Sequence, residues 1–290
     1  VKFEEGTTNI IDNLFSHANT IKEITFPASL ITIGSNSFFG CSSLNQIILP
    51  NNIKSIGSYA FSSTGITSII IPNNVNNIGS FAFSSSKLES ITFSSKMRTI
   101  SDNLFDNCLQ LETLILPTNI LNIGNEAFKN CYNLNQLILS NNLEYIGYRI
   151  LSGCSNLREI NIPKSLKNIA PFKRWDSEHS FIYSSIEKVK FEEGTTNIID
   201  NLFSHANNLK EIIFPKSLTT IGSNSFSECS SLKQIIIPQN VNYINQNSFR
   251  NCHTLTFIVN SGSYEEQYAK TNSIKIIYMD NNKTKLEKVL

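Results

Sequence analysis

The stretch that decides the fold is LETLILPTNILNIGNEAFKNCYN, residues 111–133. Successive side chains of an extended chain point to opposite faces, so Leu114 and Leu116 share one side and Ile115 lies on the other. Pro117 follows directly and has no amide hydrogen to donate to a neighbouring strand. The first part of the stretch therefore predicts a short β-strand that ends at a proline.

The second part predicts a turn and a compact closing segment. Ile120 and Ile123 belong to a second extended piece, and the glycine after them is free to take the positive φ of a tight turn. Phe128, Cys131 and Leu134 follow at intervals of three residues, so about one and a half helical turns can aim them at one interior. One such repeat of strand, turn and closing segment is a rung.

The rung recurs along most of the chain. Its first residue stands at eleven places spaced by 22 or 23 residues, with one interval of 29: Ile21, Leu44, Ile66, Leu88, Leu111, Leu134, Leu157, Ile186, Leu209, Leu232 and Leu255. One rung cannot cover its own apolar face, whereas stacked rungs bury a continuous core. We therefore predict an α/β-type repeat solenoid, a right-handed stack of about eleven rungs. A parallel β-sheet forms one face, with short helical turns and extended segments on the other.

The chain also contains a duplication. VKFEEGTTNIIDNLFSHAN occupies residues 1–19 and again residues 189–207, and residues 1–44 differ from residues 189–232 at seven positions. Copying a block of rungs lengthens a stack without breaking it, because each rung contacts only its neighbours. The duplication is therefore compatible with a solenoid.

The rung LETLILPTNILNIGNEAFKNC resembles the leucine-rich repeat of the BspA-like class, also called the Treponema-type repeat, with its L-x-x-I-x-[LI]-P, IG, AF and C signature. The resemblance covers nearly all of residues 1–260, including an irregular rung at 157–185. Residues 261–279 resemble the C-terminal cap of such arrays, a short helix and a last strand, and residues 280–290 read as a polar tail or linker. The resemblance implies a leucine-rich repeat fold in a microbial cell-surface or secreted protein, and several proteins of this class act as adhesins for host matrix proteins or cells.

Composition narrows the range of partners. The 24 basic and 23 acidic residues give a net charge of +1 with neither sign in a block, which argues against nucleic acid. No apolar run approaches the roughly 18 residues of a membrane span, so we expect no direct membrane insertion within this segment. Val1 lies in a strand-like segment with no signal peptide before it, so we expect an excerpt from a longer protein.

The six cysteines indicate packing. All occupy one place of the rung, where other rungs have Ala, Thr or Ser: Cys41, Cys108, Cys131, Cys154, Cys229 and Cys252. A place that accepts these residues suits a small buried side chain, so we predict a ladder of free thiols. The alternative is a disulfide between stacked neighbours such as Cys131 and Cys154. Zinc-type C-x-x-C spacing and catalytic or nucleotide-binding motifs are absent, so we expect no metal, no cofactor and no catalytic residue.

The irregular rung contains APFKRWDSEHSFIYSS, residues 170–185, and is six residues longer than a standard rung. Insertions in solenoids fall on loops that often bind partners, and Trp with Arg is a favoured pair in binding hot spots. Arg174 and Trp175 are therefore a candidate hot spot. The alternative is that Phe172, Trp175 or Phe181 fills the gap left by the missing rung Phe and Cys.

The fifth place of each rung lies on the outward side of the first strand. It is occupied in turn by Lys2, Thr25, Ile48, Ile70, Thr92, Ile115, Ile138, Asn161, Lys190, Ile213, Ile236 and Val259. A long exposed apolar column flanked by polar residues is typical of an interaction site. The alternative is that isoleucine here only satisfies strand propensity. The candidate ligand-binding residues are Ile48, Ile70, Ile115, Ile138, Ile213 and Ile236.

Two functions from different classes fit these patterns. The first is a non-enzymatic protein–protein interaction module, which the resemblance extends to adhesion to host matrix proteins or cells. The second is a structural spacer or scaffold that presents other domains without binding a ligand itself. A hydrolase would need a cleft, which a regular solenoid seldom offers.

Overall fold

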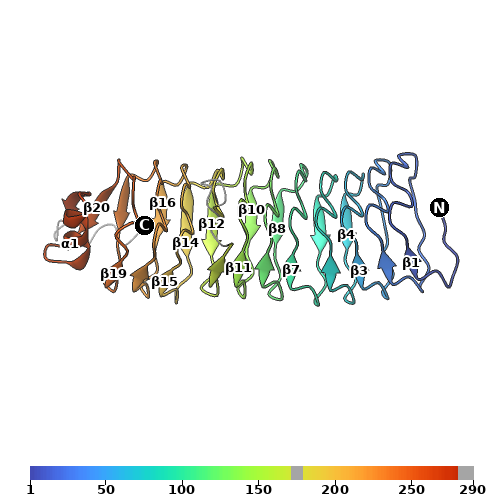
Figure 1. Cartoon of the computed structure of the whole chain (residues 1–290), viewed down its shortest axis with the longest axis horizontal. Coiled ribbons are helices and arrows are strands. Elements are labelled where there is room, and N and C mark those ends of the chain that lie inside the picture. Colours follow the sequence, from blue (N-terminus) through green and yellow to red (C-terminus); the bar gives the residue numbers. More distant parts are fainter. Residues whose placement is uncertain (171–178, 280–290) are drawn as a thin grey trace, which may run out of the picture.

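The computed structural model describes residues 1–170 and 179–279. These residues form one elongated stack of rungs in chain order (Figure 1). The N-terminal rungs lie at one end, and the one α-helix of the described residues lies at the other. The predicted parallel β-solenoid of about 11 turns is thereby confirmed.

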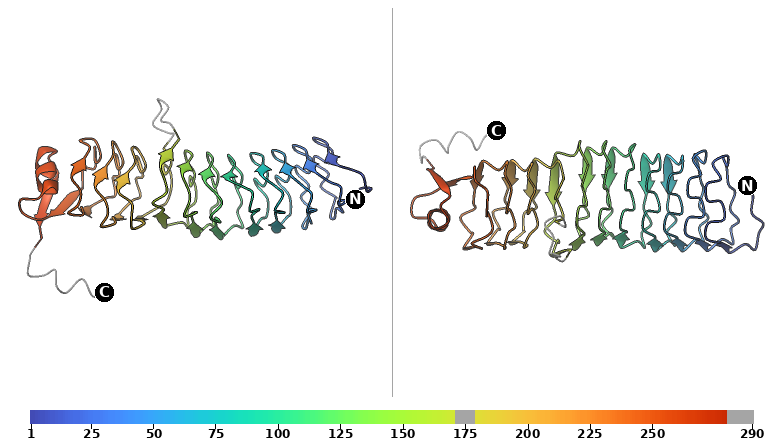
Figure 2. Two further views of the ribbon diagram at one scale, coloured as in Figure 1. Left: turned by 90° about the horizontal axis from the view of Figure 1, so that it is seen from below. Right: turned by 45° about the horizontal axis from the view of Figure 1, so that its top comes forward.

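Two parallel ladders run along the stack (Figure 2). The first ladder is built from the strand that precedes the proline: β4 (Ser68–Ile70), β6 (Ser90–Thr92), β8 (Thr113–Ile115), β10 (Gln136–Ile138), β12 (Glu159–Ile162), β14 (Lys188–Phe191), β16 (Glu211–Ile213), β18 (Gln234–Ile236), β20 (Thr256–Val259) and β21 (Lys275–Tyr278). Its strands pair in four groups, β4-β6, β8-β10, β12-β14-β16 and β18-β20-β21. Equivalent residues of neighbouring rungs lie side by side, as Leu114 and Leu137 do.

The second ladder is built from the two-residue strands that follow the proline. They are β1 (Asn9–Ile10), β2 (Thr32–Ile33), β3 (Ser55–Ile56), β5 (Asn77–Ile78), β7 (Thr99–Ile100), β9 (Asn122–Ile123), β11 (Tyr145–Ile146), β13 (Asn168–Ile169), β15 (Asn197–Ile198), β17 (Thr220–Ile221) and β19 (Tyr243–Ile244). They pair as β1-β2-β3-β5, β7-β9-β11-β13 and β15-β17-β19. Both interruptions fall where Ser101 or Ile199 takes the place of the rung glycine and an Asp follows.

The core lies between the ladders and is organised around stacked phenylalanines. Phe38 and Phe61 have ring centroids 5.5 Å apart with planes 4° from parallel, and Phe105 and Phe128 have centroids 5.8 Å apart at the same angle. These rings are fully buried. Because one large ring per rung lies on the ring of the next, each rung supplies the apolar surface that its neighbour lacks.

The closing segment differs from the expectation of short helical turns. In the rung of residues 111–133 it consists of hydrogen-bonded turns in which Glu126 and Asn130 have positive φ angles of 52° and 57°. The amides of Glu126, Phe128 and Asn130 donate to carbonyls of the next rung, at N···O distances of 2.8–3.1 Å. A continuing helix would direct these amides back along its own axis. The turns instead join neighbouring rungs, as the strands do.

The duplicated sequence shows how a preceding rung reduces the exposure of the side chains it covers. Leu14 is 42% exposed in the first copy, whereas Leu202, its equivalent, is 1% exposed in the second. Val1 and Val189 differ in the same way, at 51% and 0%. The sequences around them are identical, so the difference comes from the rung that precedes the second copy and lies against its apolar face.

The C-terminal end is covered by α1 (Tyr264–Thr271) and β21. Ser263 is the N-cap of α1 and accepts a hydrogen bond from the Glu266 amide, while the Glu266 side chain accepts one from the Gly262 amide. This reciprocal arrangement satisfies amides that a helix start leaves unpaired. Tyr268 places its ring on Phe257 with centroids 6.0 Å apart, so the helix closes the core of the last rung.

Candidate functional site

The predicted isoleucine column lies on the solvent-facing side of the first ladder. All six candidate isoleucines are exposed, with exposed fractions between 36% for Ile213 and 84% for Ile48. Leu114 and Leu116, which flank Ile115 in the sequence, are buried. The alternation expected from the sequence is therefore present, and it leaves a row of large apolar side chains in solvent.

One member of the predicted column was misplaced. Val259 is fully buried, and the residue that pairs with Ile236 is Ile258. The last regular strand begins one residue earlier relative to its leucine than in other rungs, which turns every side chain to the opposite face. Ile258 then pairs with Ile277, which is 43% exposed, so the column continues to the last strand.

Two polar residues divide the column into two stretches. Asn161 and Lys190 occupy the outward place in β12 and β14, between Ile138 and Ile213. A hollow of about 360 Å³ lies here, and its floor includes Ile138 and Ile162. The adjoining strands carry ion pairs between Lys188 and Glu211 (3.4 Å), Arg158 and Glu187 (3.3 Å), and Lys210 and Glu187 (2.7 Å). The first stretch is therefore Ile48 to Ile138, and the second begins at Ile213.

A larger groove opens at the N-terminal end of the same face. It has a volume of about 690 Å³ and is lined by residues 22–26 and 45–48 and by Pro50, which belong to consecutive rungs. Among the described residues, no backbone hydrogen bond joins residues 45–49 to either neighbouring rung. Ile48, the most exposed isoleucine of the column, lies at this groove.

The irregular rung is closed by one of the residues proposed to plug it. Phe181 is fully buried, and its ring lies on that of Phe203 with centroids 4.5 Å apart. Ser184, also buried, stands at the place where regular rungs have cysteine. Phe172 and the candidate hot spot, Arg174 and Trp175, lie outside the described residues.

The six cysteines form the predicted ladder of free, buried thiols. Each Sγ donates a hydrogen bond to the phenylalanine carbonyl of the preceding rung, for instance Cys131 to Phe105 (3.0 Å) and Cys154 to Phe128 (3.0 Å). Burial raises the pKa of the Cys108 and Cys154 thiols to about 12. Protonated thiols are poor nucleophiles and poor metal ligands, so the ladder is part of the packing.

A second polar ladder was missed in the sequence. The Asn or Ser that stands two residues after the rung proline donates to a backbone carbonyl of the preceding rung, as Asn119 does to Met97 (2.7 Å) and Ser165 to Leu143 (2.7 Å). Asn142 and Asn240 make equivalent bonds at 2.9 and 2.7 Å. The signal was the recurrence of Asn or Ser at one rung place. It links neighbouring rungs where the chain turns between the ladders.

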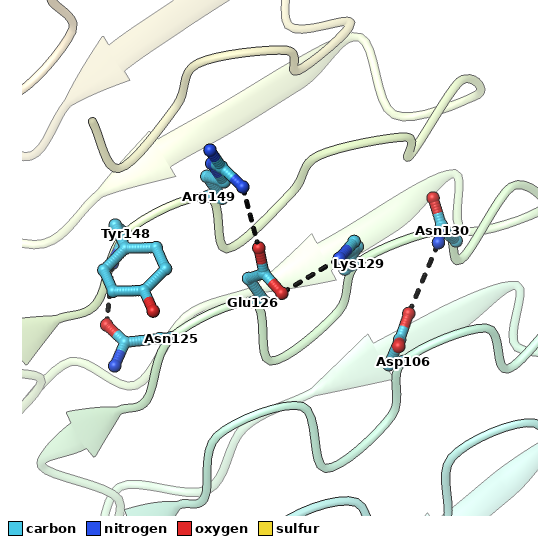
Figure 3. Close-up of polar contacts among 7 residues, drawn as sticks. All are labelled: Asp106, Asn125, Glu126, Lys129, Asn130, Tyr148 and Arg149. Carbon is cyan, nitrogen blue, oxygen red and sulfur yellow. Dashed lines mark hydrogen bonds and ion pairs between the residues drawn. The ribbon is translucent and has the colours of Figure 1, made fainter. Parts of the chain in front are cut away.

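Charged side chains meet across the turns of three successive rungs (Figure 3). Glu126 accepts from Lys129 of its own rung at 2.9 Å and from Arg149 of the next rung at 3.2 Å. Asn130 reaches Asp106 of the preceding rung at 3.4 Å, and burial raises the pKa of the Asp106 carboxyl. Such partly exposed pairs contribute little stability each. They orient side chains across rungs, and they contain no nucleophile with an orienting base.

An aromatic strip, also missed in the sequence, lies on the turns of the N-terminal rungs. The rings of His17, Phe39, Tyr59 and Phe81 are in successive contact, and the last two stack with centroids 4.6 Å apart. Tyr59 and Phe81 have positive φ, at places where most rungs have Asn. In the second copy of the duplication, Ser227 stands in place of Phe39, so the contact between His17 and Phe39 has no equivalent there.

Two negative findings apply to residues 1–170 and 179–279. No group of three or more His, Cys, Asp and Glu side chains there could hold a metal ion. No helix within these ranges is long and apolar enough to cross a membrane.

The parallel ladders, the one-ring-per-rung core and the outward isoleucine column define a leucine-rich repeat solenoid. The family model for the BspA type leucine rich repeat region matches residues 1–86, 54–172 and 177–289, and the chain belongs to this family. Leucine-rich repeat proteins of this kind are interaction or scaffold modules and are generally non-enzymatic.

Solved structures with similar folds come from several bacteria. A leucine-rich repeat protein from Bacteroides ovatus is 24% identical, with a TM-score of 0.65, over 96% of this chain and 83% of that one. A leucine rich cell surface protein from Faecalibacterium prausnitzii is 19% identical, with a TM-score of 0.39, over 94% and 83% of the two chains. The pneumococcal vaccine antigen PcpA is 20% identical, with a TM-score of 0.37, over 97% and 91%. A search of curated proteins gave no significant match. At these identities the likeness concerns the fold alone.

Proposed function

We propose that this chain is a non-enzymatic protein–protein interaction module of a microbial cell-surface or secreted protein, and that it attaches to host matrix proteins or cells through the isoleucine column. The observation that supports this most is the exposure of Ile48, Ile70 and Ile115, which are 60% to 84% exposed while the residues on either side of each in the sequence are buried. Members of the BspA type leucine rich repeat family are surface proteins, which agrees with the proposed location.

The physical reason is the free energy that covering the column would release. Fully burying one isoleucine side chain contributes about 1.5–3 kcal/mol. The isoleucines stand on strands of a rigid stack, so a partner that covers several of them orders few side chains on binding. The polar residues beside them, such as Thr113 and Gln136, are exposed and would form the rim of the interface.

The test is the double substitution Ile115→Lys with Ile138→Lys. Both side chains already lie in solvent, so folding should be unchanged, while attachment to immobilised matrix proteins or host cells should fall at least tenfold because two ammonium groups would be buried. The matched control is Leu109→Lys with Tyr132→Lys, which adds the same charge at exposed hydrophobic positions outside the sheet. Normal attachment by the isoleucine variant would refute the proposal.

The candidate hot spot, Arg174 and Trp175, remains part of the proposal as a second contact point. Adding alanine at both positions to the Ile115→Lys, Ile138→Lys variant should weaken attachment further than that variant does alone. If the loop only fills the rung, the substitution should leave attachment unchanged and lower the thermal midpoint instead.

A structural spacer is the alternative function. The interruption of the column by Asn161 and Lys190 favours it, because a spacer needs a continuous core and has no need of a continuous outer face. A spacer would bind no matrix protein as an isolated segment, and lysine at Ile115 and Ile138 would have no effect on attachment by the intact protein.

A further inference from the structure

The distance between successive side chains in the first stretch of the isoleucine column can be compared with the repeats of a helical and an extended partner. Its outward places are Ile48, Ile70, Thr92, Ile115 and Ile138 on consecutive rungs. Ile70 and Thr92 lie on paired strands, as do Ile115 and Ile138, and paired strands lie about 4.8 Å apart. The other two intervals have no strand pairing, so the four intervals span at least roughly 19 Å along the stack. All five side chains are exposed. A partner that contacts the whole stretch must present apolar groups at a similar repeat.

An α-helix has such a repeat. Residues at alternating three- and four-residue spacing lie on one face and rise about 5.3 Å per step, so four steps span roughly 21 Å, about 2 Å more than the minimum span of the column. An extended peptide presents same-face side chains every 6.6–6.8 Å or so, and four steps span roughly 27 Å. At the paired strands the extended peptide therefore gains about 2 Å on the column with each step, whereas the helix gains about 0.5 Å and keeps closer register.

The charges beside this stretch indicate the charge that a partner should carry. Glu89 and Glu112 are exposed, each three residues before an outward place of the column. No ion pair involves either one among residues 1–170 and 179–279. The opposite rim of the same rungs is largely neutral, and its Lys96 donates to Asn74 at 2.9 Å. Unpaired acids on one side of an apolar row favour a partner with basic residues on the matching side.

The second stretch, which begins at Ile213, has basic instead of acidic residues beside it. Lys210 and Lys233 stand at the places equivalent to Glu89 and Glu112, and Lys210 is paired with Glu187 at 2.7 Å. The two stretches therefore share the apolar row and differ in the charge of its rim. A basic partner should distinguish between them.

We propose that the stretch from Ile48 to Ile138 binds an amphipathic α-helix of a partner protein, which lies along the solenoid axis and carries Lys or Arg beside its apolar stripe. The inference rests on the proposed function, since it names the partner's shape and charge for the same column. Recognition has the helix-in-groove form, with apolar anchors at three- and four-residue intervals.

The experiment uses a synthetic peptide of about 15 residues, long enough for the roughly 21 Å of the stretch. The helical probe has leucines at alternating three- and four-residue spacing with lysines on one flank. The first control has the same composition but places its leucines at every second position. The second control keeps the leucine spacing and has glutamates in place of the lysines. Binding to the full chain is measured by fluorescence anisotropy, and helix formation by circular dichroism. Only the lysine-flanked helical probe should bind and gain helicity.

Variants of the chain locate the site. Ile115→Lys with Ile138→Lys should weaken binding of the helical probe at least tenfold, whereas the Leu109→Lys with Tyr132→Lys control should not change it. Glu89→Lys with Glu112→Lys should weaken the lysine-flanked probe and admit the glutamate-flanked one, a charge exchange that a loss of folding cannot imitate. Equal binding of the alternating-leucine control, or binding that survives lysine at Ile115 and Ile138, would overturn the inference.

Failure of this inference and failure of the proposed function give different results. If the helical probe does not bind but lysine at Ile115 and Ile138 still abolishes attachment to matrix proteins, the partner is not a basic helix and the proposed function stands. If the same substitutions leave attachment intact, both fail.

Discussion

Replacing Phe128 with alanine tests the stacked-ring core. Its ring is fully buried and lies on that of Phe105 with centroids 5.8 Å apart. An aromatic side chain buries roughly 150–250 Å², which at about 25 cal/mol per Å² is worth about 4–6 kcal/mol. Alanine keeps part of that contact, so the substitution should lower the free energy of unfolding by about 3–5 kcal/mol, the range found for such truncations.

The same substitution should act locally. The Phe105 amide donates to Ala127, and the Phe128 amide donates to Ile150 in the next rung. Native-state hydrogen exchange should show faster exchange at these amides and those of the adjoining rungs, with the Phe226 amide unchanged, because coupling passes only between neighbours. Tyr132→Ala, at an exposed position of the same rung, is the control. Equal acceleration along the whole chain would refute this account of the core.

Three further predictions concern the glycines, the thiols and the C-terminal helix. In Gly124→Ala the new Cβ would lie 2.6 Å from the Asp102 amide nitrogen, so the substitution should cost about 1–3 kcal/mol in urea denaturation, and an unchanged midpoint would contradict this. Burial raises the pKa of Cys108 and Cys154 to about 12, above the ordinary value of 9.0. Because the unfolded chain ionises these thiols at lower pH than the folded chain, the free energy of unfolding should be constant below pH 9 and should fall as the pH rises towards 12. Substituting both with alanine should flatten that alkaline slope. Hydrogen bonds from a lysine, a tyrosine and a backbone amide lower the pKa of Glu266 to about 2 from 4.5, so amide protection of α1 should weaken as the pH falls through that interval. Glu266→Gln should remove this acid dependence, and an unchanged acid profile in that variant would count against the assignment.

The architecture was predictable because the same repeat of 22 or 23 residues governs the strands, the turns and the core. The recurrence of Leu, Pro, Gly, Phe and Cys at fixed rung places predicts strands, turns and core together, and a single misassigned rung cannot hide the repeat. The free thiols were predictable for the same reason, since Cys41 and Ala18 alternate at one small buried place. Phe181 could be proposed as a plug because the missing rung phenylalanine left a place that only a large apolar residue could fill.

Other features depend on backbone geometry that the period does not specify. Phe128, Cys131 and Leu134 at intervals of three fit a helix, yet left-handed residues such as Glu126 and Asn130 turn the chain so that its amides reach the next rung. The outward place of the last rung was misassigned because a one-residue change in strand start exchanges the faces of the sheet. The aromatic strip went unnoticed because its four rings stand at more than one rung place, two of them where most rungs have Asn, so it follows no apolar periodicity.

The most direct measurement is hydrogen–deuterium exchange of the chain with and without a bound matrix protein. The proposed function predicts added protection in the strands that carry Ile70, Ile115 and Ile138 and in the segment that carries Ile48, with no change in the turns on the opposite side. Protection confined to those turns, or the absence of any protected strand in a saturated complex, would contradict the claim that this protein binds through its isoleucine column.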